Sequence, residues 1–292
     1  MFINEKELYY FCKHRLLVLE KQLKEFIIIE EGNLICSSCS IIMIPIKTLP
    51  HKIQYRCKKC YKKNTIYALK TNFKFYNIIE VINFVFYFSV GITASEISTL
   101  SDIPLAQVYR FYKTLQTILH ENYQINNEKI GGENCTVEID ESQIGKRKNN
   151  VGRIPNHKII FGGICRENRE VFMKLVENKT CAVLGREIIS NIKPGTTIFT
   201  DQWSSYMSFF SNQNSYKHNF VNHRLNFVDP EDGTHTQTIE SLWSEFKRFK
   251  RRLCYSKQRL IHLYISEFLI RRKFKNEANS SLQLFKYLLN II

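Results

Sequence analysis

The chain has 292 residues, a hydrophobic content of 44% and a formal charge of +15 at pH 7. This composition supports a packed core and excludes global disorder, and the length allows one large domain with one or two small modules. The excess of Lys and Arg gives the surface a positive potential that attracts polyanions such as nucleic acids. Charge alone does not distinguish DNA from RNA or from an anionic membrane.

The first segment, residues 1–33, is charged and helix-prone. Its apolar positions suit one face of a helix; they are Leu16, Leu19, Leu23 and Phe26. The segment lacks the apolar core of a signal peptide, so we do not expect secretion.

The most apolar stretch, residues 78–90, is shorter than the roughly 20 residues that a membrane span needs, and it contains Glu80 and Asn83. We therefore expect a buried helix there and no membrane partner. The protein should be intracellular, in the nucleus of a eukaryotic host or otherwise in the cytoplasm.

Four of the nine cysteines form two close pairs, Cys36 with Cys39 and Cys57 with Cys60. Residues 40–56 separate the pairs, a spacing typical of a four-cysteine zinc ribbon. Such a module, which we assign to residues 34–70, is too small to fold on its own core and is stabilised by the bound Zn²⁺. The alternative is that these are free cysteines of a core. Lysines crowd the second pair, which suits a DNA contact or an ordinary solvated face.

The region 74–125 is expected to be helical. An apolar helix to residue 90 is followed by a short helix over residues 94–100 and by another that starts at Leu105 and reaches His120. Two helices joined by a tight turn, in this order, are typical of a helix-turn-helix.

In this helix-turn-helix, Ile97 and Leu100 would pack on Val108 and Phe111. The outer face of the second helix would then be polar and available to the major groove; it carries Gln107, Arg110 and Lys113. Many structural helical hairpins share this pattern, and that alternative remains open.

A polar stretch with Gly131 and Gly132 is a plausible linker to a fourth segment, residues 135–275. Its strand candidates are residues 136–141, 158–165, 170–177 and 196–200, and its helix candidates are residues 181–192, 238–252 and 257–274. This order predicts an α/β fold with a mixed sheet flanked by helices. Residues 276–292 would form a helical tail.

Three acids of this segment have the ingredients of a two-magnesium site. Asp140 lies near the end of one expected strand, Asp201 lies at the end of another, and Glu240 lies at the start of a helix. Mg²⁺ prefers carboxylate oxygens, and two such ions activate the attacking oxygen and stabilise the leaving oxygen of a phosphoryl transfer. For Glu240 alone, an idle charge at a helix N-terminus is the simpler interpretation.

The helix that carries Glu240 is amphipathic. Lys247, Arg248 and Arg251 lie on the side of Glu240, opposite an apolar stripe that includes Trp243. These cations suit the phosphates of DNA, although an ordinary basic solvent face would look the same.

Several motifs together resemble the DDE transposases, most closely the Merlin family and its bacterial, ISXO-like insertion-sequence relatives. The motifs are Glu138-Ile-Asp-Glu-Ser142, Gly145-Lys-Arg-Lys148, Phe161-Gly-Gly-Ile164, Pro194 to Asp201, and the run from Val221 to Trp243 with His235-Thr-Gln237. The resemblance implies an RNase H-like catalytic domain and metal-ligand roles for Asp140, Asp201 and Glu240, with Mg²⁺ or Mn²⁺ as the cofactor.

The resemblance also implies cut-and-paste transposition, in which DNA is cut at terminal inverted repeats and the freed 3′ hydroxyl attacks target DNA. DNA is then the partner, and two transposon ends require a homo-oligomer. We expect Lys146, Arg147 and Lys148 to contact DNA. His235 is a secondary catalytic candidate, because a structural hydrogen-bonding role explains it equally well.

Three alternatives remain. A domesticated or inactive transposase would bind DNA without cutting it. A zinc-ribbon and helix-turn-helix regulator would do the same and would not need the acids. A stand-alone RNase H-like nuclease would hydrolyse DNA without joining strands.

Overall fold

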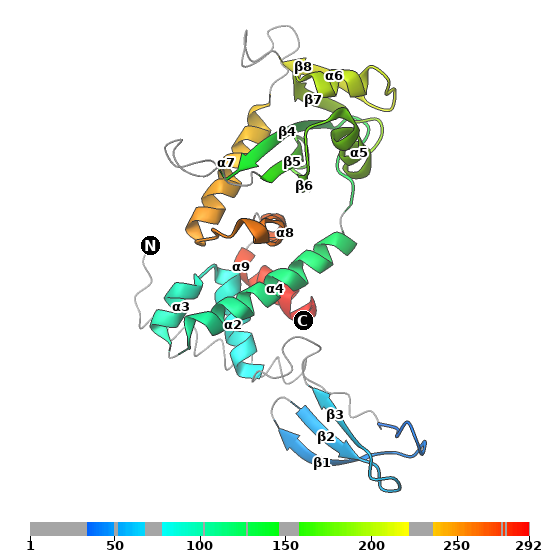
Figure 1. Cartoon of the computed structure of the whole chain (residues 1–292), viewed down its shortest axis with the longest axis vertical. Helices are drawn as coiled ribbons and strands as arrows, with labels where there is room; N and C mark the ends of the chain where they lie inside the picture. Colours follow the sequence, from blue (N-terminus) through cyan, green and yellow to red (C-terminus); the bar gives the residue numbers. More distant parts are fainter. Residues whose placement is uncertain are drawn as a thin grey trace. The chain divides into compact units, whose positions relative to one another are not determined.

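A computed structural model of the chain describes residues 34–49, 52–67, 78–101, 103–126, 128–145, 158–221, 236–275, 277 and 279–291 (Figure 1). The N-terminal segment, the basic run at residues 146–148 and His235 lie outside these described residues. The chain divides into two compact units, the first up to Asn83 with Ile292 and the second from Phe84 to Ile291.

The first unit contains a small antiparallel sheet in the order β1-β2-β3. Its strands are β1 (Ile44–Leu49), β2 (Lys52–Arg56) and β3 (Lys63–Tyr67). Among the residues of the module that the structure describes, the buried cluster is small: Cys36, Met43, Tyr55 and Cys57. So small a core does not stabilise a fold by itself, which agrees with the expected need for a metal.

The second unit is built on a five-stranded mixed sheet in the order β6-β5-β4-β7-β8. The strands are β4 (Thr136–Ile144), β5 (Lys158–Cys165), β6 (Val171–Val176), β7 (Thr197–Asp201) and β8 (Lys217–Val221). β4, β5 and β6 are antiparallel, whereas β7 and β8 run parallel to β4. This topology is RNase H-like and confirms the expected fold class.

Helices cover both faces of the sheet (Figure 1). On one face are α5 (Cys181–Asn191) and α6 (Ser204–Phe210). The other face carries α7 (Gln237–Arg252) against β4 and β5, and α8 (Ile261–Phe274) against β6. Because side chains alternate along a strand, Val137 and Ile139 of β4 enter the core beneath α5, and the intervening residues face α7.

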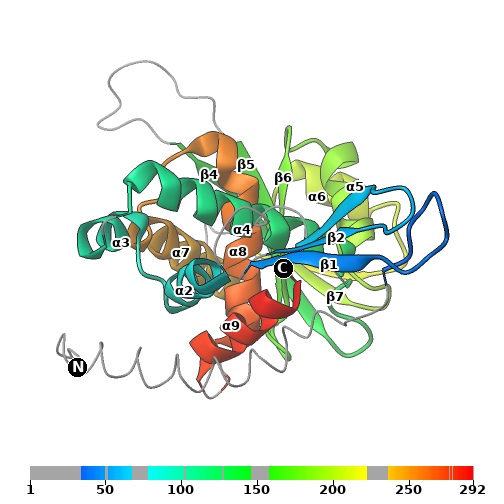
Figure 2. The same ribbon diagram turned by 90° about the horizontal axis from the view of Figure 1, so that it is seen from below.

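The helical region before the sheet consists of α2 (Ile78–Val90), α3 (Ala94–Leu100) and α4 (Leu105–Ile125), and the chain ends in α9 (Ser280–Ile291). α4 packs on α8, and α9 packs on both α4 and α8 (Figure 2). No helix of the described residues is long and apolar enough to cross a bilayer. The expected domain boundaries stay predictions.

Three local expectations need correction. Leu100 does not pack on α4, because it is 71% exposed, while Ile97 is buried. Leu100 lies six residues after Ala94, about 120° away around the helix, and so leaves the buried face.

The expected helix from residue 257 begins instead with a 3₁₀ turn, η3 (Gln258–Leu260). The glycine stretch is no free linker, because the backbone N–H of Gly132 donates to Thr196 Oγ1 at 2.8 Å.

Candidate functional site

The two aspartates belong to neighbouring parallel strands. β4 pairs with β7 from Thr136 opposite Thr197 to Glu138 opposite Phe199. Two residues further on, the same register brings Asp140 level with Asp201 on the same face of the sheet. Asp201 ends β7 as expected, but Asp140 lies in the middle of β4 and not near its end, because β5 continues to pair with β4 as far as Ile144.

Glu138 attaches the start of α7 to this part of the sheet. Its side chain is fully buried and accepts a hydrogen bond from the backbone N–H of Ile239 at 2.9 Å. That N–H belongs to the first turn of α7 and has no partner within the helix, so the carboxylate acts as a cap supplied by the strand. On its other oxygen, Glu138 pairs with Arg166 at 2.6 Å.

Trp243, one turn further along α7, makes the second attachment. Its indole N–H donates to Asp140 Oδ2 at 2.9 Å. Gly162 leaves room for the ring, since a Cβ there would lie 2.7 Å from Trp243 Cη2. Gly162 is directly opposite Asp140 in the β4–β5 pair, so the strand, the glycine and the indole fix the orientation of one carboxylate.

Glu240 lies between these two attachments. It is exposed in the first turn of α7 and three residues before Trp243, a spacing that makes the two side chains neighbours on the helix surface. Glu240 therefore lies on the flank of α7 next to the residue whose ring reaches Asp140.

The electrostatics of Asp140 reflect its surroundings. Burial raises the pKa of Asp140 to about 6, and the negative charges of Glu141 and Asp201 act in the same direction. The hydrogen bond from Trp243 partly opposes this by lowering the pKa. Negative charges that raise the pKa of Asp140 favour a bound divalent cation, which would offset this repulsion.

The three carboxylates do not come, as a set, within 4.8 Å of one another in the described part of the chain. Ligands of a two-ion site need not be that close. With ions about 4 Å apart and oxygens about 2 Å from each ion, ligands on opposite sides are separated by up to about 8 Å. The chemistry of this donor set, three carboxylates, is the one that hard divalent cations prefer.

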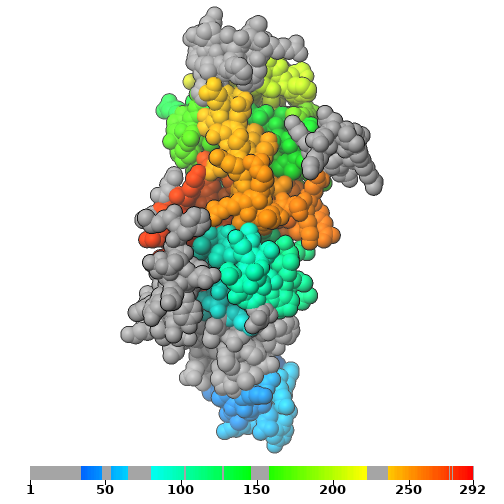
Figure 3. Space-filling model, turned by 90° about the vertical axis from the view of Figure 1, so that its left-hand side faces the viewer, coloured from blue at the N-terminus to red at the C-terminus, as the bar shows by residue number. Residues whose placement is uncertain are grey.

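The outer face of α7 continues from Glu240 as a basic surface. Lys247, Arg248 and Arg251 are exposed, as expected, and Figure 3 shows α7, coloured from yellow to orange, as a ridge on one face of the molecule. Lys247 and Arg251 lie seven and eleven residues after Glu240, so they share its side of the helix.

The expected contacts on the second helix of the helix-turn-helix lie on α4. Arg110 and Lys113 are exposed and Gln107 is half-buried. The opposite side of α4 is packed: Phe111 stacks on Phe84 with ring centroids 4.4 Å apart. The polar face is therefore available to a ligand.

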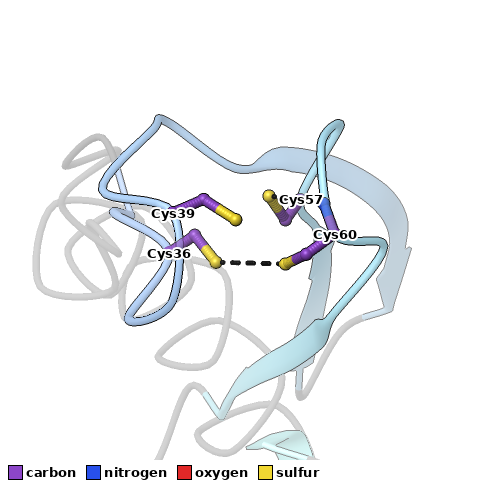
Figure 4. A group of neighbouring side chains, drawn as sticks. All are labelled: Cys36, Cys39, Cys57 and Cys60. Atoms are coloured by element: carbon purple, nitrogen blue, oxygen red, sulfur yellow. Dashed lines mark hydrogen bonds between the residues drawn. The ribbon is translucent and has the colours of Figure 1, made fainter.

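The four cysteines of the first unit converge (Figure 4). Their sulfur atoms all lie within 4.8 Å of one another, and Cys36 Sγ and Cys60 Sγ are 3.5 Å apart. Zinc–sulfur bonds of about 2.3 Å in a tetrahedron imply sulfur–sulfur distances of about 3.8 Å. The cluster can therefore hold one Zn²⁺.

The backbone turns of the two cysteine pairs are alike. In the first pair, Cys36 O accepts from Ser40 N at 2.9 Å, and in the second, Cys57 O accepts from Tyr61 N at 3.1 Å. Hydrogen bonds led by the backbone N–H of Cys60 lower the pKa of Cys57 to about 6. A lowered pKa favours the thiolate that binds zinc.

Sequence reasoning did not identify Glu138 or the hydrogen bond of Trp243 as parts of this site. The available signal was the alternation of β4, in which Val137 and Ile139 point to one face and put Glu138 on the same face as Asp140.

A comparison with protein families matches residues 127–273 to the ISXO2-like transposase domain. This match covers half of the chain, and the chain belongs to that family. The protein is therefore of the transposase type, a DNA-acting enzyme of the nuclease and transferase class, and such enzymes generally use divalent metal ions.

Among solved structures, the catalytic core domain of BIV integrase matches at 8% identity with a TM-score of 0.34, over 53% of this chain and 95% of that one. The comparison with curated proteins gives no match.

Proposed function

We propose that the protein is a DDE transposase that catalyses cut-and-paste transposition, with Asp140, Asp201 and Glu240 as the ligands of two Mg²⁺ or Mn²⁺ ions. The observations that support this best are the register of β4 and β7, which brings Asp140 level with Asp201, and the hydrogen bond to Asp140 from Trp243, three residues after Glu240 on α7. The bound ions would activate the attacking oxygen and stabilise the leaving oxygen of the phosphodiester.

The residues of the chain perform the positioning. Glu138 and Trp243 fix α7 against β4, so that Glu240 keeps a constant place relative to Asp140. Lys247 and Arg251, on the same side of α7, bind the DNA phosphates that flank the scissile bond. In the first reaction water attacks the phosphorus atom and releases a 3′ hydroxyl; in the second that hydroxyl attacks target DNA and displaces another 3′ oxygen.

Two further parts of the proposal concern DNA and assembly. The zinc-bound ribbon and the polar face of α4 bind transposon ends, Gln107, Arg110 and Lys113 facing the major groove. Lys146, Arg147 and Lys148 add phosphate contacts. Two ends are joined by at least two subunits, because each end needs a catalytic site.

The test is a strand-transfer assay with the inverted repeats that flank the coding sequence. Wild-type protein with Mg²⁺ or Mn²⁺ should nick these ends and join them to a second duplex. Asp201→Asn and Glu240→Gln should abolish both steps and keep DNA binding, whereas Glu121→Gln, which changes an exposed acid on α4, should leave both steps intact.

The outcomes separate the alternatives. Binding without cleavage would indicate a domesticated transposase or a regulator, and hydrolysis without joining would indicate a nuclease. Cleavage at the wild-type rate by Asp201→Asn would contradict the assigned ligands.

A further inference from the structure

Two buried side-chain atoms of the described residues lack a hydrogen-bond partner, the hydroxyl of Tyr123 and Nε of Arg272. Tyr123 is 5% exposed and lies in the last turn of α4, and Arg272 lies in the last turn of α8. Both atoms are donors. Buried donors without an acceptor are rare in native proteins, and each needs a specific explanation.

Both residues line the same cavity, which has a volume of about 700 Å³. The turn between β5 and β6 contributes Arg169 to its wall, and the end of α8 contributes Lys273 and Lys275. With Arg272 there are four cationic residues against two acids, Glu128 and Glu170. The cavity therefore combines positive charge with two unused donors.

The ion pairs among the described residues involve only part of this positive charge. Lys275 donates to Glu245 at 2.6 Å, and Arg272 pairs with the same carboxylate. Among the described residues, neither Arg169 nor Lys273 makes an ion pair. The natural complement is an anion with several acceptor oxygens.

We propose that this cavity is a phosphate-binding site, separate from the carboxylates of β4, β7 and α7. The charge of a phosphate group meets the exposed Arg169 and Lys273. Its oxygens then lie next to the Tyr123 hydroxyl and Arg272 Nε, two donors that the protein covers and that a small side-chain movement opens to the cavity. The volume lies in the range of ligand pockets of about 300–1,000 Å³ and so accommodates a phosphate with the group attached to it. The phosphate belongs either to the DNA backbone or to a free phosphate ester.

The site does not depend on the proposed reaction. Its β5–β6 turn adjoins the first residue of β4, since Arg166 N donates to Thr136 O at 2.9 Å, whereas Asp140 lies further along that strand. Binding at the cavity and catalysis at the carboxylates can therefore fail independently.

The experiment measures binding by the full-length chain without added divalent cations. Pyrophosphate and ATP are titrated by calorimetry. A DNA duplex of about 20 base pairs is titrated at several salt concentrations. Tyr123→Phe removes only the hydroxyl. Arg169→Asn removes a charge at a residue with φ of +62°, a conformation that Asn tolerates.

Two variants serve as matched controls. Tyr109→Phe removes an exposed hydroxyl on α4, and Arg186→Gln removes an exposed charge on α5. Neither residue lines the cavity.

We expect Tyr123→Phe and Arg169→Asn each to weaken binding of the phosphate ligand about tenfold, as the loss of one charge-assisted hydrogen bond or ion contact implies, and the controls to bind normally. If the ligand is the DNA backbone, duplex affinity falls and Arg169→Asn lowers the salt slope by about one. If it is a free ester, only the affinities for pyrophosphate and ATP fall.

A second readout is the stability of the free protein. Since Tyr123→Phe removes a hydroxyl that has no partner, the free variant should unfold at the same temperature as the wild type or at a higher one. Unchanged binding of all three ligands in both variants, or a lower unfolding temperature of free Tyr123→Phe, would overturn the proposal.

Discussion

Trp243→Phe tests how the site is organised. The substitution keeps an aromatic ring against Gly162 and removes the indole N–H that donates to Asp140 at 2.9 Å. A hydrogen bond to a charged group contributes about 1.5–3 kcal/mol. If that contribution is needed in the transition state, the cleavage rate falls about 10- to 150-fold.

The control is Trp203→Phe, which changes the other tryptophan of the chain. Trp203 is 47% exposed, and it contacts Asp201 through its backbone N–H at 3.2 Å, which the substitution preserves. This variant should therefore cleave at nearly the wild-type rate. It also leaves Trp243 as the sole indole fluorophore, which reports binding of Mn²⁺ or Mg²⁺ beside Asp140.

The assay is single-turnover cleavage of a labelled transposon end over a range of Mg²⁺ concentrations, with thermal unfolding and DNA affinity measured in parallel. Trp243→Phe should need more Mg²⁺ for half-maximal rate, because Asp140 is less well oriented, and should bind DNA normally. A folded Trp243→Phe variant that cleaves within twofold of the wild type at all Mg²⁺ concentrations would refute the positioning role.

Three other perturbations have defined outcomes. Glu138→Gln breaks the ion pair with Arg166 and should lower the free energy of unfolding by about 3 kcal/mol. Urea titration measures this change. A decrease of less than about 1 kcal/mol would contradict a structural role for Glu138. Gly162→Ala should destabilise by about 1–3 kcal/mol and reduce cleavage, because the new Cβ meets the Trp243 ring; normal activity would show that the ring adapts. Burial lowers the pKa of His218 to about 4, below about 6.5 in the unfolded chain, so the unfolded state binds more protons between these values. Stability should fall as the pH drops from 6.5 to 4, by about 1 kcal/mol because His218 is only half-buried and solvent screens its charge, and His218→Gln should flatten that profile.

Periodicity along the chain predicted the elements well wherever the local pattern decides the structure. The strand over residues 158–165 and the helix over residues 94–100 have the expected bounds, and the helix of residues 78–90 is present. The prediction from periodicity failed where a residue distant in the sequence determines the bounds of an element. Asp140 lies in mid-strand because β5 extends the pairing of β4 to Ile144, which the residues of β4 alone do not reveal.

For the proposed site, too, some features could be predicted from the sequence and others could not. Residue type and spacing predicted the four cysteines that converge and the three acids of the proposed site, because metal chemistry restricts which side chains serve as ligands. They did not identify the contacts that position those acids. Trp243 was recognised as part of an apolar stripe, but its partner Asp140 lies 103 residues earlier, and Glu138 reaches Ile239 across 101 residues.

These two long-range contacts fix α7, the helix that carries Glu240, against β4. Glu138 and Asp140 are alternate residues of one strand, and each bonds to α7, at the first turn and one turn later. Two attachments fix both the position and the rotation of a helix, whereas one would leave it free to turn about the contact. Because Glu240 lies between them, its direction follows from the strand, and the burial of Glu138 keeps water from competing for the cap. In the proposed site, the exposed Glu240 is thus positioned through a buried acid, Glu138, that holds the start of its helix.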